Sequence, residues 1–261
     1  MSYKDKIIAL DIDGTLAKDD AYPSEYTYKK IQELINKGYE IILVTGRGYA
    51  SVKEIYDKCT MTNFCVLHNG ALVMNPTTRE IIRNITYPEN MIFDILNNQE
   101  LMKYIDDIMI EHMEDVYSSG NKLWRSYQTN GDLKKILVGK EIYTINVWLN
   151  DPSNHKKVEE IVNKFENHKY RYWNHQGEIY AITYTKKDGV EALLKHYNKT
   201  FDDLLFIGDH DNDIELLKAA GIGVAMKNGS EKAKAAANEM TSLINLEDGA
   251  VKYLLHKLNE E

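Results

Sequence analysis

Short, unbroken apolar runs that end at polar turns are the feature that most constrains this fold. A strand that is apolar at every position is typical of a parallel sheet covered on both faces. Two such runs are Ile7–Leu10 and Ile41–Val44, and a helical pattern begins at Ser24 between them and ends at Gly38. A second helical pattern follows the second run. This order predicts right-handed crossovers and a Rossmann-like α/β core with a parallel sheet.

The middle third of the chain has a different pattern. From about residue 82, the segments 142–149 and 178–184 alternate apolar and polar residues, which is typical of strands with one solvated face. Two helices are predicted between such strands from apolar side chains at Leu101, Tyr104, Ile105, Ile108 and Met109, and at Val158, Ile161, Val162 and Phe165. We expect an inserted α+β cap domain over 82–184 and a discontinuous core over 1–81 and 185–261.

The solid apolar pattern returns after about residue 185. It predicts buried strands in LLFIGD (204–209) and GVAM (223–226), and a final helix near Ala250–Leu258. Earlier in the chain, Asn69-Gly70 lies between two apolar pairs and predicts a hairpin. The two ends of the chain are therefore expected to share one sheet.

Composition excludes several classes of partner. The formal charge is 32 − 40 = −8, so we expect no basic groove and no nucleic-acid partner. No apolar run approaches the roughly 20 residues of a membrane span, and the first residues lack a signal-peptide pattern. Cys59 and Cys65 have no metal-like spacing and are predicted to be buried thiols, which favours a reducing cytoplasm. A monomer or weak oligomer is the default expectation.

Four short segments follow apolar runs or open helices, and together they carry the chemistry. They are DIDGT (11–15), VTGR (44–47), TKKDG (185–189) and GDHDND (208–213). The carboxyl ends of parallel strands form the ligand crevice of such a sheet. Convergence of Asp11, Asp13, Asp209 and Asp213 requires a cation, and carboxylates without Cys or His ligands suit Mg²⁺.

An aspartate beside Mg²⁺ can attack a phosphoryl group and form an aspartyl-phosphate. The transferring group needs positive charge and hydrogen-bond donors around it. A lysine of TKK, the Thr45 hydroxyl and the amides around Gly14 and Gly46 meet that need. Asp13 is the candidate for the acid that protonates the leaving alkoxide and later activates water.

The ordered set of motifs resembles the haloacid dehalogenase superfamily, and within it the Cof-like phosphatases with a large α/β cap. The resemblance covers nearly the whole chain and includes DIDGTL (11–16), TGR (45–47), HNGA (68–71), GDHDND (208–213) and the tail from GIGVAMKNG to LEDGAVKYL. It implies that Asp11 is the nucleophile and Asp13 the general acid/base. It also implies that Mg²⁺ is held by Asp11, the Asp13 backbone carbonyl and Asp209, with Asp213 acting through water.

The resemblance assigns the remaining site residues with some alternatives left open. Lys186 is preferred to Lys187 as the motif lysine, and Asn212 is expected to steady the phosphate-side network. Arg47 and Asn69 are expected on the substrate side, although Arg47 could instead brace the loops as an ion pair. Lys227 stands where the family commonly has glycine. Cap aromatics could stack on a substrate ring or fill the sheet core; they are Tyr143, Trp148, Trp173, Tyr180 and Tyr184.

The function predicted from these residues is Mg²⁺-dependent hydrolysis of small phosphorylated metabolites, such as sugar phosphates, through an aspartyl-phosphate. One alternative is a phosphosugar mutase of the same fold, in which the phosphoryl group returns to the sugar. Another is a non-catalytic phospho-acceptor module, which also combines acids, a Thr and a Lys around Mg²⁺. Such modules are about half this length and lack a second acid two residues after the acceptor.

Overall fold

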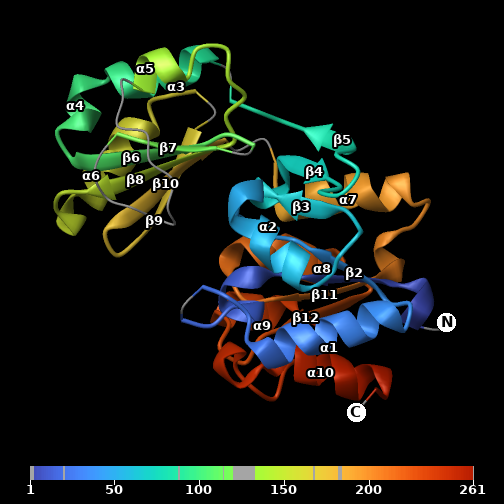
Figure 1. The fold of residues 1–261 in the computed structure, drawn as a ribbon. Coiled ribbons are helices and arrows are strands. Elements are labelled where there is room, and N and C mark those ends of the chain that lie inside the picture. Colours follow the sequence, from blue (N-terminus) through green and yellow to red (C-terminus); the bar gives the residue numbers. More distant parts are fainter. Residues whose placement is uncertain are drawn as a thin grey trace. The chain divides into compact units, whose positions relative to one another are not determined.

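The computed structural model describes residues 3–19, 21–87, 89–113, 115–119, 133–166, 168–181 and 184–260. The chain divides into two compact units (Figure 1). The first unit comprises Met1–Arg47, Val52–Asn84 and Tyr184–Glu261, and the second comprises Gly48–Ser51 and Ile85–Thr183.

A five-stranded parallel sheet forms the centre of the first unit. Its spatial order is β13-β12-β11-β1-β2, and every neighbouring pair is parallel. The strands are β1 (Ile7–Leu10), β2 (Glu40–Leu43), β11 (Leu204–Gly208), β12 (Ile222–Ala225) and β13 (Glu239–Met240). The predicted parallel-sheet core is confirmed, and its two central strands come from opposite ends of the chain.

Helices cover both faces of this sheet (Figure 1). Alternate residues of β1 point to opposite faces, and Ile7 and Ala9 pack with apolar side chains of the helices α7 and α8. The helices α1 and α10 contact each other on the other face. The helices of this region are α1 (Glu25–Asn36), α2 (Tyr49–Lys58), α7 (Lys186–His196), α8 (Ile214–Ala219), α9 (Glu231–Ala236) and α10 (Gly249–Leu258). Because the strands β1 and β11 are covered on both sides, they are buried at every position and apolar throughout.

A small antiparallel sheet extends the first unit. It joins β3 (Cys65–Leu67), β4 (Leu72–Met74) and β5 (Ile81–Asn84). The predicted hairpin is confirmed, and its turn has Asn69 and Gly70 at positive φ. Cys59 and Cys65 are buried free thiols, as expected.

The second unit is a five-stranded antiparallel sheet with helices. Its order is β7-β6-β8-β10-β9. The strands are β6 (Ile105–Glu111), β7 (Val116–Ser118), β8 (Thr144–Leu149), β9 (His168–Trp173) and β10 (Gln176–Ala181), and the helices are α3 (Glu89–Asn97), α4 (Gln99–Met102), α5 (Leu133–Ile136) and α6 (His155–Val162). The cap aromatics differ in environment, because Tyr143 and Trp148 are buried whereas Trp173 is 44% exposed.

One predicted helix of the second unit is wrong. Helix α4 ends at Met102, and Ile105–Glu111 forms the strand β6. The register of β6 against β8 shifts between Ile105 and Asp107. Because of this irregularity, the side chains of Ile105, Ile108 and Ile110 all lie in the same buried cluster. Their separations of three and then two residues imitate the periodicity of a helix. The other predicted helix is confirmed as α6.

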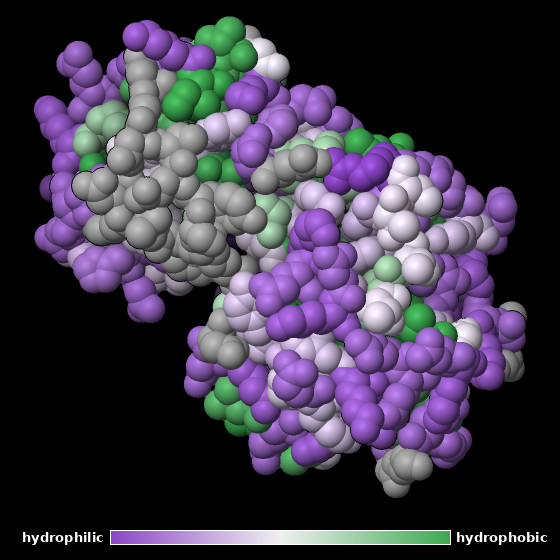
Figure 2. Space-filling view, in the orientation of Figure 1, coloured by the Kyte–Doolittle hydropathy of each residue, from purple (hydrophilic) through white to green (hydrophobic). Residues whose placement is uncertain are grey.

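Apolar residues are mostly enclosed within the two units. On the face shown in Figure 2, hydrophilic residues predominate. Two of the large hydrophobic side chains that are exposed are neighbours on β9, and the others lie in different segments of the chain. Among the described residues they are Tyr26, Ile81, Val138, Tyr172, Trp173, Met240 and Leu246. Within the described ranges no helix has the length and apolar character to cross a membrane.

Candidate active site

The turn after β1 places Asp11 at the carboxyl end of the parallel sheet. The Asp11 amide donates to the carbonyl of Ile207 on β11 at 3.0 Å, which continues the sheet's pairing into the turn. The turn then reverses at Gly14, where φ is +72°. A Cβ at Gly14 would lie 2.2 Å from Oδ2 of Asp209. Glycine is therefore required on two grounds, its backbone conformation and the close approach of the two acidic loops.

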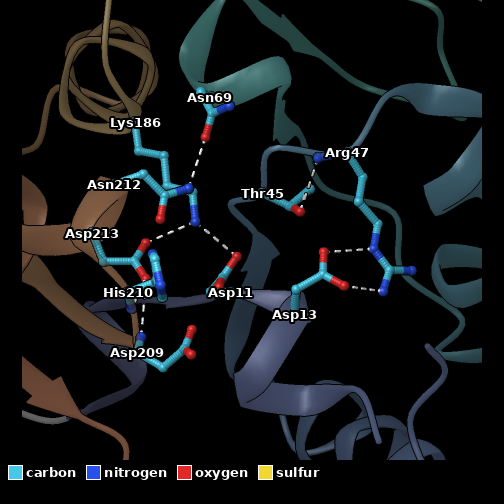
Figure 3. A network of polar contacts seen from close by, with 10 residues as sticks. All are labelled: Asp11, Asp13, Thr45, Arg47, Asn69, Lys186, Asp209, His210, Asn212 and Asp213. Carbon is cyan, nitrogen blue, oxygen red and sulfur yellow. Dashed lines mark hydrogen bonds and ion pairs between the residues drawn. The ribbon is translucent and has the colours of Figure 1, made fainter. Parts of the chain in front are cut away.

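Lys186 is the cation that contacts the Asp11 carboxylate. Its side chain is 1% exposed, and its Nζ donates to Oδ1 of Asp11 at 2.8 Å and to Oδ1 of Asp213 at 2.7 Å (Figure 3). Lys187 is oriented differently, with Nζ 5.9 Å from the ring centroid of Phe201. Of the two lysines, the structure therefore brings Lys186 to the site.

The start of α7 explains how Lys186 reaches this position. Thr185 caps the helix, and its backbone amide donates to Oδ2 of Asp188 at 2.8 Å. One turn further along, a Cβ at Gly189 would lie 2.7 Å from the Cα of Gly70. The two glycines let the helix lie directly against the hairpin turn, so the first helical residue is directed to the end of the sheet.

Three carboxylates converge beside Lys186. Asp11, Asp209 and Asp213 each offer an oxygen, and these oxygens lie within 4.8 Å of one another. Oδ2 of Asp213 accepts hydrogen bonds from the amides of Asp209 at 2.9 Å and His210 at 3.0 Å. Oδ1 of Asp209 is buried and has no hydrogen-bond partner within the described part of the chain. That oxygen is the feature expected of a cation ligand.

The electrostatics of this cluster also favour a cation. Burial raises the pKa of Asp11 well above its usual range; Lys186 lowers it, and Asp213, Asp209 and Asp13 raise it further. Burial and then Asp213 raise the pKa of Asp209 to about 7. Burial opposes the charge on Lys186, but the two ion pairs outweigh it and raise its pKa. One ammonium faces three carboxylates, and a hard divalent cation with oxygen ligands fits this set.

Thr45, Asn69 and Asn212 line the neighbouring side of the site. Thr45 is fully buried, and its carbonyl accepts from the Asn69 amide at 3.0 Å. Nδ2 of Asn212 donates to Oδ1 of Asn69 at 2.9 Å (Figure 3). A Cβ at Gly46 would lie 3.1 Å from the Asn69 side-chain amide. The polar segments VTGR (44–47), TKKDG (185–189) and GDHDND (208–213) thus all contribute residues around Asp11.

Arg47 and Asp13 form a separate pair on the other side of Asp11 (Figure 3). Nε of Arg47 donates to Oδ2 of Asp13 at 2.8 Å, and Nη2 donates to Oδ1 at 2.5 Å. Of the two roles that the sequence left open for Arg47, the structure shows the ion pair. His210 is exposed and contributes its backbone amide to the acidic loop.

Comparison with known proteins identifies the family of this chain. The family profile of the haloacid dehalogenase-like hydrolases matches residues 8–254. The chain is a haloacid dehalogenase-like hydrolase. It is 30% identical to the 5-amino-6-(5-phospho-D-ribitylamino)uracil phosphatase YitU of Bacillus subtilis, over 97% of this chain and 98% of the relative. The 5-amino-6-(5-phospho-D-ribitylamino)uracil phosphatase YcsE, also of Bacillus subtilis, is 26% identical over 96% of this chain and 95% of the relative.

Solved structures share the fold of this hydrolase. A haloacid dehalogenase-like hydrolase from Bacteroides thetaiotaomicron has a TM-score of 0.85 at 21% identity, covering 97% of this chain and 99% of that one. A Thermotoga maritima protein has a TM-score of 0.83 at 24% identity, and the match covers 98% of this chain and 97% of that one. The family match and the relatives named as phosphatases confirm the expectation of a Cof-like phosphatase.

Two residues that the sequence analysis did not single out hold the turn that follows Asp11 in this hydrolase. Nδ2 of Asn228 donates to the Gly14 carbonyl at 2.8 Å, and its Oδ1 accepts from the Asn245 amide at 3.0 Å. Nδ2 of Asn245 donates to the Ala17 carbonyl at 2.8 Å. Both residues lie in the tail that carries the family resemblance, but their partners are more than 200 residues away in sequence. Lys227 is exposed, and its backbone amide donates to Oγ1 of Thr241.

Replacing Asn228 with alanine is expected to lower kcat/KM for phosphate release by about tenfold, because displacement of a catalytic group is costly. The free energy of unfolding should fall by only about 1 kcal/mol, the contribution of a typical hydrogen bond. Lys227→Ala is the matched control, since that side chain is exposed. Steady-state kinetics and urea unfolding measure both quantities. Equal kcat/KM for the two variants would show that Asn228 does not position the turn.

Proposed function

We propose that this hydrolase is a Mg²⁺-dependent phosphomonoesterase that acts on small phosphorylated metabolites through an aspartyl-phosphate on Asp11. The observation that carries the proposal is the environment of the Asp11 carboxylate. It is buried, its Oδ1 accepts from Lys186, and it lies in the acidic cluster where Oδ1 of Asp209 has no partner within the described residues. This combination suits a nucleophile that receives a dianionic phosphate beside a cation.

In the first half-reaction, a carboxylate oxygen of Asp11 attacks phosphorus and the bond from phosphorus to the substrate oxygen breaks. Asp13 gives its proton to the departing alkoxide. In the second half-reaction, Asp13 takes a proton from water, the water oxygen attacks phosphorus, and the bond to Asp11 breaks. Inorganic phosphate and the dephosphorylated substrate leave, and both aspartates return to their starting state.

The surrounding groups match the charge of the transferring phosphoryl group. The Lys186 ammonium offsets negative charge beside Asp11, and the Thr45 hydroxyl and the amides near Gly14 and Gly46 are the proposed donors. Asn69 and Asn212 support the same side of the site through their mutual hydrogen bond. Asp11, Asp209 and the Asp13 carbonyl would hold Mg²⁺, with Asp213 acting through water. The cation would neutralise the carboxylates and polarise the phosphoryl oxygens.

The role proposed for Asp213 is supported by its contacts. Its two oxygens already accept from Lys186 and from two backbone amides. A carboxylate used in this way orients the loop that carries Asp209, so an indirect contact with the cation is preferred.

The substrate class is tested with a panel of phosphate esters. The relatives' names put 5-amino-6-(5-phospho-D-ribitylamino)uracil on the panel, beside sugar phosphates, pyridoxal phosphate and flavin mononucleotide. Phosphate release should require Mg²⁺, fall at least about 100-fold with a chelator, and return when Mg²⁺ is restored. Absence of Mg²⁺-dependent release from every ester would refute the proposal. Isomerisation of a sugar phosphate that requires a bisphosphate activator would identify a mutase instead.

A further inference from the structure

We propose that Arg47 is a positioning residue that sets the orientation of the Asp13 carboxyl group, and that it does not bind the substrate phosphate. The inference rests on the proposed function, because it assigns a role within the same site. Its basis is the two-point contact in which Nε and Nη2 of Arg47 face the two carboxylate oxygens of Asp13.

Arg47 is held firmly by contacts other than Asp13. Its side chain is 7% exposed. Its amide donates to Oγ1 of Thr45 at 3.1 Å, and its carbonyl accepts from the His68 amide at 3.0 Å. Nη2 also donates to the Ala21 carbonyl at 2.9 Å. The guanidinium is therefore placed by the fold before any substrate binds.

The Asp13 carboxylate, in contrast, is exposed, and Arg47 contacts both of its oxygens. The Asp13 side chain is 63% exposed, and the next residue is the left-handed Gly14. An exposed aspartate samples several rotamers, and proton transfer is efficient only from an oriented one. A carboxylate has about four lone-pair sites, and the Arg47 contact itself uses only two. It therefore does not block the proton that Asp13 gives to the alkoxide and later takes from water.

The same contact argues against a phosphate ligand. Arginine recognises phosphate best with two parallel N–H groups on one edge. In Arg47 the Nε–Nη2 edge is occupied by Asp13, and Nη2 also donates to the Ala21 carbonyl. Only Nη1, which is buried, has no hydrogen-bond partner within the described residues, so neither edge offers two free N–H groups to a phosphate. An arginine in this arrangement acts on the reaction through Asp13.

A double-mutant cycle tests the proposal. Phosphate release from the best ester of the panel is measured with Mg²⁺ for wild type, Arg47→Gln, Asp13→Asn and the double variant. Arg47→Gln should lower kcat by on the order of tenfold to a hundredfold while KM changes by less than about twofold. In the Asp13→Asn background, the same change should alter kcat by less than about twofold, because two residues that act as a unit are not additive.

Arg47→Lys provides the second variant. Lysine keeps the charge but loses the two-point contact, so its kcat should stay near that of Arg47→Gln; it replaces Arg47→Gln in the cycle if that variant does not fold. Lys257→Gln is the control for loss of a cation in the same unit, since its partner is Glu239. Thermal unfolding of each variant establishes that it is folded.

The opposite results would overturn the proposal. A tenfold rise in KM with kcat unchanged, restored by Arg47→Lys, would make Arg47 a phosphate ligand. If Arg47→Gln lowered kcat by the same factor in the Asp13→Asn background as in wild type, Arg47 would act independently of Asp13. If wild type and Lys257→Gln released no phosphate from any ester, the proposed function would fail instead, so the two failures are distinguishable.

Discussion

Asp11→Asn is expected to reduce kcat/KM for phosphate release by on the order of 10⁴-fold or more. An asparagine amide has the size of the aspartate but cannot form the proposed acyl phosphate. Asp211→Asn is the matched control, because that exposed residue lies in the same acidic loop as Asp209 and pairs with Lys232 and Ser230. Phosphate release with Mg²⁺ and mass spectrometry of the trapped phosphoenzyme measure the effect. A phosphorylated, active Asp11→Asn protein would refute the nucleophile assignment.

The same Asp11→Asn substitution, which lowers activity, is expected to raise the free energy of unfolding when Mg²⁺ is absent. Burial raises the pKa of Asp11 and, with Asp213, raises that of Asp209 to about 7. A carboxyl whose pKa is higher folded than unfolded contributes stability that is present below about pH 4, the unfolded value, and is lost as pH rises through the folded value. In chelator, the free energy of unfolding should therefore fall between about pH 4 and 7. Asp11→Asn should be the more stable protein at pH 7, and Mg²⁺ should reverse this order.

Lys186→Met is expected to damage both stability and turnover. The substitution leaves Asp11 and Asp213 buried without the ammonium that now contacts both. Breaking a buried ion pair by removing one partner costs about 3–5 kcal/mol, and kcat/KM should fall by about 10³-fold because the phosphoryl charge loses its neighbour. Urea unfolding and steady-state kinetics provide the two measurements.

The neighbouring lysine supplies the control for that substitution. Lys187→Met should change stability by less than about 1 kcal/mol, since Lys187 Nζ lies near the Phe201 ring and not near the carboxylates. The destabilisation by Lys186→Met should also shrink as pH falls, because burial raises the pKa of Asp11 and the carboxyl takes up a proton. Equal stability and activity of the two variants would show that Lys186 has no special role.

Much of the core could be predicted because burial on both faces leaves a direct trace in a strand's sequence. The strands β1, β2 and β11 are apolar at almost every position. Because these strands are parallel neighbours, the residues that follow them lie together at the carboxyl end of the sheet. Strand β6 could not be predicted in this way. Its register shift interrupts the alternation of buried and exposed residues, and one irregular position is enough to change the apparent period.

The sequence by itself determined the parallel core, the four polar segments at its edge and the family to which they belong, because each of these depends on residues that are close together in the chain. Only the tertiary structure decided between Lys186 and Lys187, paired Arg47 with Asp13, and brought Asn228 to the Gly14 carbonyl. Each of those contacts joins residues from separate elements. Direction and distance between side chains depend on how helices and loops pack, as the Gly70–Gly189 contact does for Lys186, and no local pattern records that packing.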